Sequence, residues 1–306
     1  MKDKSVEWIE VSVRVLPEAA EAVSELLSRY APQGVAIDLG EGSDDPDAKR
    51  PTDEPVIVRA YLSEEAAASG ARRAIEEGLW HLSQIWDVIS EPTFRSIPDQ
   101  DWTEGWKSRV PTIHLGRRVV IKPSWRTYAP AEKEIVLEMD PGLAFGTGLH
   151  PTTQLCVQAV EDLLEPGDRV LDLGTGTGIL ALVAAKLGAA SVLAVDTDEN
   201  AVTAARQNVR ANGAEGAIAL RHGSLGDVQG RYDLILANIL APVIETMAQE
   251  GLAARLQPEG TLIASGILNE QVEDVCEVLV ANGLRMTARR TSHAWAALIA
   301  EPVPGS

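Results

Sequence analysis

The stretch 169–180, with the sequence RVLDLGTGTGIL, constrains the fold of this chain more than any other feature. Its first half is a short apolar run, which is typical of a buried parallel strand. Gly174, Gly176 and Gly178 follow at every second position, and apolar residues at helical spacing then continue to a stop at Gly188. A strand, a glycine turn and a helix let a ligand approach bare backbone and the N–H groups of the helix N-terminus. The stretch therefore predicts an α/β fold with a ligand site at this turn.

Two acidic residues near the turn indicate which kind of ligand binds there. Asp172 lies two positions before Gly174, and Asp196 ends the next predicted strand. Asp172 would repel a pyrophosphate and attract an ammonium group, while Asp196 suits the hydroxyls of a ribose. The third glycine also comes one position earlier than in the dinucleotide fingerprint. The pattern favours S-adenosylmethionine over NAD, and the alternative is that the glycines serve only a tight turn.

The acidic charge of the chain is common for solubility alone, and it would also attract a basic protein. The formal net charge is −18, and the acidic excess is divided between residues 1–97 and 151–306, while 98–150 is balanced. Direct binding of nucleic acid is not expected without a broad basic footprint, whereas an acidic surface attracts a basic protein. The sequence shows no run that could span a membrane and no signal peptide, so a cytoplasmic location is expected. The two cysteines lie far apart, and no metal site is predicted.

The first 97 residues predict a small α+β domain. Hydrophobic spacing places four strands and two helices there in the ferredoxin-like order β-α-β-β-α-β. The expected strands are 8–15, 35–39, 56–62 and 88–97, and the expected helices begin at residue 17 and cover 64–85. Such a domain could bind RNA through strand aromatics, but strand 56–62 offers only Tyr61, so docking of a protein is favoured. An acidic loop is expected over 40–55.

Residues 98–125 are expected to link this domain to a second one at 126–306. Trp102 and Trp106 lie four positions apart and share one face if the segment is helical. They either pin the connection between the domains through apolar burial, which is the favoured interpretation, or line a cleft for the methyl acceptor.

The second domain alternates strands and helices. Short strands at 119–122 and 135–139 are expected to lead into it. Further strands are expected at 170–173, 191–196, 218–221, 232–238 and 261–265, and helices at 155–164, 179–187, 199–212, 243–255 and 271–281. The last two strands, 284–290 and 294–299, lie too close together for a crossover helix and should form an antiparallel pair at the sheet edge. Ligands bind outside the carboxyl ends of parallel strands, so Asn238 should join Gly174 and Asp196 at one rim. Its amide could orient an amine without ionising.

The loop before the first of these helices is also unusual. Gly146 and Gly148 permit uncommon backbone angles, and Thr152 and Thr153 lie where hydroxyls could cap the helix and contact a ligand. His150 is expected to be structural, because no nucleophile accompanies it.

These segments together resemble the bacterial family of ribosomal large-subunit protein eleven methyltransferases (PrmA). The loop 144–153, the glycine motif, Asp196 and the sequence Ala-Asn-Ile-Leu at 237–240 carry the resemblance, which spans nearly the whole chain. It implies a Rossmann-like seven-stranded class I methyltransferase domain at 126–306 and S-adenosylmethionine as cofactor. The cofactor contacts that it implies are Thr153, Gly174, Asp196 and Asn238, to which the glycine turn adds Asp172 and Gly176.

The resemblance further implies methylation of lysine side chains and an N-terminal α-amine on a basic ribosomal large-subunit protein. The ferredoxin-like domain 1–97 would hold this substrate, and the linker 98–125 would reposition it. Asn238 is expected to orient the amine, and no general base is assigned. Alternatives are an RNA methyltransferase with the same catalytic domain, a dinucleotide-binding oxidoreductase and a binding module without catalysis.

Overall fold

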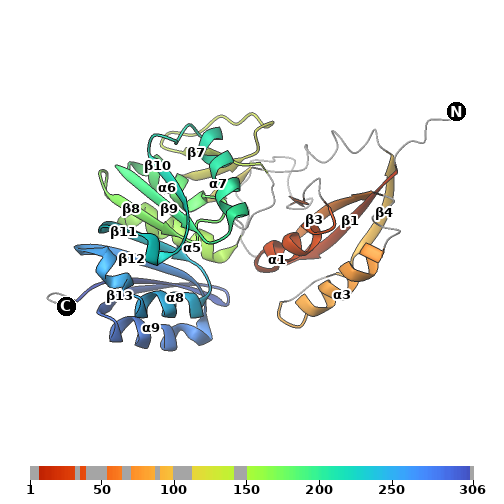
Figure 1. Ribbon diagram of the computed structural model, residues 1–306. Coiled ribbons are helices and arrows are strands. Elements are labelled where there is room, and N and C mark those ends of the chain that lie inside the picture. The colour runs from red at the N-terminus through yellow and green to blue at the C-terminus, as the bar shows by residue number, and fades with distance from the viewer. Residues whose placement is uncertain are drawn as a thin grey trace. The chain divides into compact units, whose positions relative to one another are not determined.

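The structure is a computed structural model that describes residues 7–31, 35–38, 54–63, 70–86, 90–98, 112–140 and 150–303. The chain divides into two compact units (Figure 1). The second unit contains His114–Ile121, Pro130–Glu138 and the chain from Pro151 onward. Several predicted features lie outside the described residues, namely 40–53 of the acidic loop, Trp102, Trp106, Gly146 and Gly148. The domain boundaries after residues 97 and 125 stay predictions.

The first unit is built on an antiparallel sheet with the order β2-β3-β1-β4. Its elements follow the predicted order and are β1 (Glu7–Val15), α1 (Pro17–Ser28), β2 (Val35–Asp38), β3 (Val56–Ser63), α3 (Arg72–Leu82) and β4 (Thr93–Pro98). Alternation along β1 turns Val11, Val13 and Val15 into the core, where they are fully buried. Leu27 of α1 and Ile75 of α3 pack into the same core.

Two elements of this unit are shorter than predicted. α3 ends at Leu82 because the chain tightens into a turn, in which the Ile85 N–H donates to the Leu82 carbonyl at 3.0 Å. β4 begins at Thr93, while residues 88 and 89 of the predicted strand lie outside the described residues. Before it, the Ser90 hydroxyl accepts the N–H of Arg14 at 2.9 Å, and the Ser90 N–H donates to the Arg14 carbonyl at 3.1 Å.

Tyr61, the aromatic residue of the strand predicted over 56–62, lies in the interior of the first unit. Tyr61 is 5% exposed, and its hydroxyl donates to Glu10 Oε2 at 3.1 Å. Arg59 donates to the other oxygen of Glu10 at 3.0 Å and to Asp38 at 3.3 Å. The ring of Tyr61 is therefore not available to stack on a base.

The second unit is an α/β layer structure around a seven-stranded sheet with the order β10-β9-β8-β11-β12-β14-β13. All neighbouring pairs are parallel except those of β14, which runs antiparallel to β12 and to β13. The strands are β8 (Arg169–Leu173), β9 (Ser191–Asp196), β10 (Ile218–His222), β11 (Tyr232–Asn238), β12 (Leu256–Leu268), β13 (Leu284–Ser292) and β14 (Trp295–Pro302). The predicted antiparallel pair at the sheet edge is confirmed, with β13 as the outermost strand.

Helices cover this sheet on both faces (Figure 1). They are α5 (Pro151–Leu163), α6 (Ile179–Leu187), α7 (Glu199–Ala211), α8 (Ala241–Gln249) and α9 (Val272–Ala281). α8 and α9 pack together on the face that carries Leu171 and Leu173, where Ile244 and Val275 are fully buried. α5 and α6 also pack against each other. Because side chains alternate along β8, Asp172 points to the face opposite to Leu171.

Several bounds in this unit differ from the prediction for physical reasons. α8 ends at Gln249, and a short 3₁₀ helix, Leu252–Arg255, follows Gly251, whose φ of 95° a continuing helix does not permit. α5 begins at Pro151, because proline suits the first helical position. A strand that was not predicted, β5 (Ile113–Leu115), joins β6 (Val119–Lys122) and β7 (Ile135–Glu138) in a three-stranded sheet.

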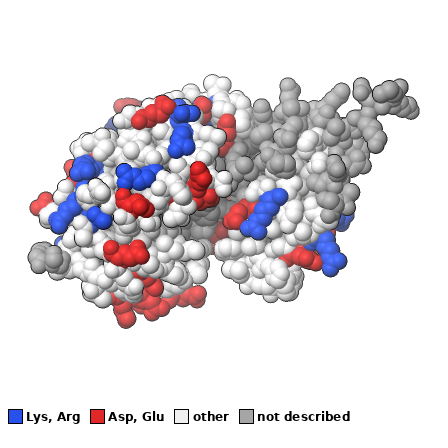
Figure 2. Space-filling model, viewed as in Figure 1, with Lys and Arg blue, Asp and Glu red and all other residues white. Residues whose placement is uncertain are grey.

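Acidic side chains gather over α8 and α9 in the view of Figure 2. The exposed acids on these helices and at their ends are Glu250, Glu273, Asp274 and Glu277. Arg289 lies 3.7 Å from Glu273 and offsets part of this charge. In the described part of the chain, no helix is long and apolar enough to cross a membrane.

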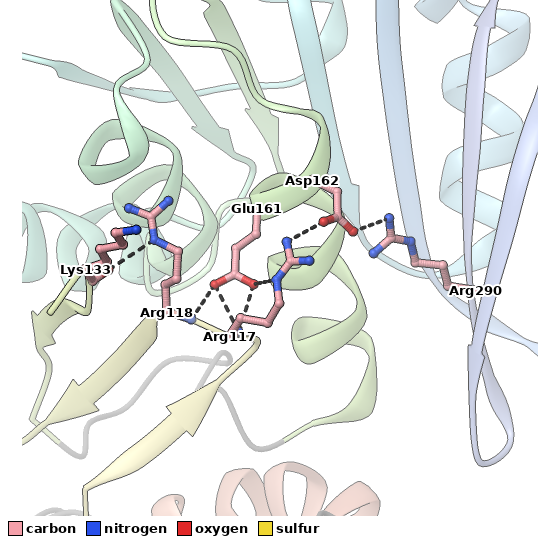
Figure 3. A network of polar contacts seen from close by, with 6 residues as sticks. All are labelled: Arg117, Arg118, Lys133, Glu161, Asp162 and Arg290. Atoms are coloured by element: carbon pink, nitrogen blue, oxygen red, sulfur yellow. Dashed lines mark hydrogen bonds and ion pairs between the residues drawn. The ribbon is translucent and has the colours of Figure 1, made fainter. Parts of the chain in front are cut away.

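A buried carboxylate of α5 anchors the turn between β5 and β6 by hydrogen bonds (Figure 3). The Glu161 side chain is fully buried and accepts the backbone N–H groups of Arg117 and Arg118 at 2.9 and 2.7 Å. Gly116, with φ +58°, leaves room for it, since a Cβ there would lie 2.7 Å from Glu161 Oε2. The next residue, Asp162, pairs with Arg117 and with Arg290 of β13. The network therefore ties the small sheet, α5 and the sheet edge together.

Candidate active site

The glycine turn after β8 is held against the end of β9. The N–H groups of Gly174 and Thr175 both donate to the Val195 carbonyl, at 2.8 and 3.1 Å. Gly174, Gly176 and Gly178 have φ values of 70°, 55° and 82°. Side-chain-bearing residues rarely adopt this left-handed region, so the glycines are required by the path of the backbone.

Asp172 lies beneath this turn and is 1% exposed. Its Oδ2 accepts the Thr175 hydroxyl at 2.7 Å, and its carboxylate also accepts the backbone N–H of Ala181 in the first turn of α6. Burial raises the pKa of Asp172 to about 6, and the charge of Asp196 adds to the increase. The carboxylate thus caps α6, whose N-cap residue Gly178 has no side chain to do so. Contact between Asp172 and the ammonium group of a ligand stays a prediction.

Asp196 stands at the end of β9 and is partly exposed. Its Oδ2 accepts the Gly176 N–H at 2.9 Å, and its Oδ1 accepts the Asp198 N–H at 2.9 Å. A carboxylate has about four acceptor positions, so each oxygen keeps one for a ligand hydroxyl. The structure therefore brings Gly176 and Asp196 together and presents the acid to the rim.

Asn238 at the end of β11 meets the first turn of α5. Its Nδ2 donates to Thr153 Oγ1 at 3.3 Å. Thr153 is 1% exposed, whereas Asn238 is partly exposed. His150, just before the helix, is buried, and this burial lowers its pKa to about 4, so the imidazole is neutral at pH 7. Two predicted site residues that lie 85 positions apart are thus hydrogen-bonded.

Two supporting residues of the turn were missed at the level of sequence. The Thr175 hydroxyl engages Asp172, and Asn208 Nδ2 of α7 donates to the Thr177 carbonyl at 2.9 Å. A threonine three positions after an acid is a local signal that could have indicated the first contact. Asn208 carries no such signal, because its partner comes from another strand-turn-helix unit.

The arrangement can hold a small molecule that has hydroxyls at one end and a cation at the other. Asp196 supplies acceptors for hydroxyls, the turn supplies backbone groups, and Asp172 supplies a negative charge below the turn. Within the described ranges, no group of three or more His, Cys, Asp and Glu residues is placed to hold a metal ion. The described residues of the rim thus offer recognition by hydrogen bonding and charge.

Comparisons with known proteins agree with this geometry. The model of the family described as ribosomal protein L11 methyltransferase (PrmA) matches residues 7–302. A ribosomal protein L11 methyltransferase of Chloroflexus aurantiacus is 40% identical over 324 residues, covering 97% of this chain and 98% of the relative. One of Herpetosiphon aurantiacus is 43% identical over 316 residues, covering 95% and 98%.

A solved structure is similar over 62% of this chain. The crystal structure of a ribosomal protein L11 methylase from Lactobacillus delbrueckii subsp. bulgaricus matches with a TM-score of 0.59 at 38% identity, covering 62% of this chain and 98% of that one. The mixed seven-stranded sheet is accordingly that of a class I methyltransferase-like α/β fold. With a family model that matches almost its whole length, this chain belongs to the ribosomal protein L11 methyltransferase (PrmA) family.

Proposed function

We propose that this protein transfers methyl groups from S-adenosylmethionine to amines of ribosomal protein L11, both lysine side chains and the N-terminal α-amine. One observation carries the proposal. Asp196 and Asn238 both lie at the carboxyl ends of parallel strands, where Asp196 is hydrogen-bonded to the glycine turn and Asn238 to Thr153. The chain that carries them matches the family model from residue 7 to residue 302. The family match gives no support to the RNA methyltransferase or oxidoreductase alternatives.

The donor set of the rim fits S-adenosylmethionine. Asp196 would accept the ribose hydroxyls, and Gly174 and Gly176 would leave backbone exposed to the amino-acid part. Thr153 would add a hydroxyl, and the negative charge of Asp172 would favour the cationic end. The chemistry that the cofactor supplies is a methyl group activated by a sulfonium. The protein must then position the cofactor, orient the substrate amine and exclude water from the site.

Asn238 is proposed to orient the amine that is methylated. Its Nδ2 donates to Thr153, which leaves Oδ1 to accept an N–H of the substrate amine. A lysine amine has a reference pKa of about 10.4 and must lose a proton before it reacts; removal from water and a nearby cation lower that pKa. His150, with a pKa of about 4, is a weak base at neutral pH. Solvent is the proposed acceptor of the proton.

The first unit is proposed to be a ferredoxin-like domain, residues 1–97, that holds the protein substrate, with residues 98–125 as linker to the catalytic domain at 126–306. The sheet order β2-β3-β1-β4 and the alternation of strands and helices support the ferredoxin-like assignment. The burial of Tyr61 argues against base stacking on this sheet. The net charge of −18 and the acids over α8 and α9 are consistent with a basic protein partner (Figure 2). The proposed location is the cytoplasm, where ribosomal proteins are made.

A transfer assay tests the proposal. The protein is incubated with methyl-labelled S-adenosylmethionine and purified large-subunit ribosomal proteins treated with ribonuclease, and the products are weighed by mass spectrometry. Label on lysine and N-terminal amines of L11 is the expected result. Label that appears only in RNA, in a parallel reaction without ribonuclease, would contradict it in favour of an RNA methyltransferase. Binding of NADH, seen by fluorescence, with no transfer would favour an oxidoreductase.

A further inference from the structure

Ile239, the residue after Asn238, is wedged between two glycines. A Cβ on Gly174 of the cofactor turn would lie 2.3 Å from Ile239 Cγ2. A Cβ on Gly266 of β12 would lie 2.2 Å from the Ile239 carbonyl oxygen. Real Cβ atoms do not approach other heavy atoms this closely, so the missing side chains are what make room for Ile239. One glycine accommodates its side chain, and the other accommodates its backbone.

The backbone of Ile239 is held as tightly as its side chain. β11 and β12 pair in parallel up to Asn238 and Ser265, and the Ile239 N–H donates to the Ser265 carbonyl at 3.1 Å. Just beyond, the register of β12 against β14 shifts between Ser265 and Ile267, and Gly266 has a φ of 84°. This bulge is the kind of irregularity that redirects the chain at a functional edge. Gly266, at this bulge, is the residue that faces the Ile239 carbonyl.

Ile239 connects the proposed binding site of the methyl donor with the residue that is proposed to orient the methyl acceptor. Gly174 belongs to the turn that would hold the methyl donor, and Asn238 is the proposed orienter of the methyl acceptor. Asn238 is covalently attached to Ile239, and Ile239 Cγ2 rests on Gly174. The partly buried side chain of Ile239 is therefore a spacer between donor and acceptor.

We propose that Ile239 is a positioning residue whose β-branched methyl sets the spacing between the glycine turn and Asn238. The inference rests on the methyl-transfer function proposed above. A β-branched side chain has few χ1 rotamers, so its Cγ2 occupies a defined place. In-line transfer of a methyl group requires the attacking nitrogen, the methyl carbon and the sulfur to be held closely aligned. Changes at this residue should consequently alter turnover more than they alter cofactor binding.

Two substitutions separate the shape of the side chain from its bulk. Ile239→Val keeps Cγ2 and loses one methyl group, whereas Ile239→Leu keeps the volume and removes the branch at Cβ. The cofactor Kd, measured by calorimetry, should stay within about twofold of wild type for both variants, while kcat should fall at least about tenfold for Ile239→Leu only. Ile244→Leu is the matched control, because Ile244 is fully buried in α8 and belongs to the core instead of the rim. It should leave kcat unchanged.

A pair of variants tests the contact itself. Gly174→Ala introduces the Cβ that would collide with Cγ2 and should weaken cofactor binding. Adding Ile239→Ala removes Cγ2 and should restore part of the cofactor affinity, because the backbone strain at Gly174 is the same in both proteins. No restoration would show that this contact does not set the turn.

The outcomes separate this inference from the proposed function. If the wild-type protein transfers no methyl group to L11, the proposed function fails whatever the variants do. If the wild type is active and Ile239→Leu matches Ile239→Val in kcat, the positioning role is wrong and the function stands. If Ile239→Leu lowers kcat and cofactor affinity to the same degree, Ile239 serves cofactor binding instead of spacing.

Discussion

The backbone N–H of Gly176 donates to Oδ2 of Asp196 at 2.9 Å, which joins the middle of the glycine turn to the end of the neighbouring strand. The same carboxylate accepts the N–H of Asp198 through Oδ1. Asp196 is therefore oriented before any ligand arrives, with both oxygens directed by backbone groups. Such preorganisation lowers the entropy lost on binding.

Asp196→Ala should weaken the binding of S-adenosylmethionine while the protein stays folded. The loss of charge-assisted hydrogen bonds to a ribose corresponds to about 1.5–3 kcal/mol, or roughly ten- to a hundredfold in Kd. Calorimetric titration measures this change. Asp198→Ala is the matched control, because Asp198 caps α7 by accepting the Asn200 N–H at 2.9 Å. That variant should lower the melting temperature and leave Kd unchanged, and equal Kd values for the two variants would speak against a ribose contact.

Ionisation of Asp172 should reduce stability as the pH rises. Its ordinary pKa of 3.8 is raised to about 6 in the folded protein, so between these values the folded state holds a proton that the unfolded state has released. The stabilisation from the neutral, buried carboxyl is complete below pH 3.8 and is lost as the pH rises through about 6. Asp172→Asn does not titrate. Its free energy of unfolding relative to wild type should therefore increase from pH 4 to 7 by on the order of 3 kcal/mol, measured by urea unfolding.

The same group should make cofactor binding depend on pH. An ionised Asp172 attracts a cationic ligand, and the ligand in turn lowers the pKa of the carboxyl. The affinity of the wild type for S-adenosylmethionine should increase between pH 5 and pH 7, whereas that of Asp172→Asn should stay flat over this range. Asp198→Asn keeps a capping side chain and should retain the wild-type profile. A flat wild-type profile would mean that Asp172 holds the turn without acting on the ligand's charge.

Removal of the Asn238 amide should affect turnover more than cofactor affinity. Asn238→Ala deletes the amide that is proposed to accept the amine, and it removes the Nδ2 donor of Thr153 Oγ1. Loss of orientation at the reacting centre should lower kcat by roughly ten- to a hundredfold. Thr153→Ser keeps the hydroxyl that meets Asn238 and should retain most of the activity, while Thr153→Val should not. Single-turnover transfer to L11 provides the measurement, and an Asn238→Ala enzyme with normal kcat would rule out the orienting role.

The buried carboxylate of Figure 3 should contribute more to stability than its exposed neighbour. Glu161→Ala leaves the N–H groups of Arg117 and Arg118 without their acceptor and should cost about 1–3 kcal/mol in the free energy of unfolding. Asp162→Asn breaks ion pairs of a side chain that is 35% exposed, and exposed pairs contribute little. Added salt should shrink the effect of Asp162→Asn and leave that of Glu161→Ala. Urea unfolding at two salt concentrations measures the free energy of unfolding of both variants. Equal decreases for Glu161→Ala and Asp162→Asn would contradict the prediction.

Elements whose determinants lie within a few residues could be predicted from the sequence. The helix 179–187 and the strands 191–196 and 232–238 have the predicted bounds, because apolar spacing and flanking glycines specify them locally. The apolar spacing predicts a helix over 243–255, but α8 ends at Gln249, because the spacing continues past Gly251 while the helical backbone conformation does not. β12 extends past residue 265 because β14, which follows it by a whole helix and a strand, pairs with it.

The amino-acid sequence was sufficient to predict which polar groups end the strands of the rim, because glycine, carboxylate and amide residues can be located from strand and turn patterns alone. It also indicated which strands would carry them. The contacts among these groups became visible only in the folded chain. Asp172 accepts the Thr175 hydroxyl below the turn, Asp196 is bonded to Gly176, and Ile239 rests between Gly174 and Gly266. The reason is that contacts between separate strands depend on pairing, register and a bulge, which no single stretch of sequence contains.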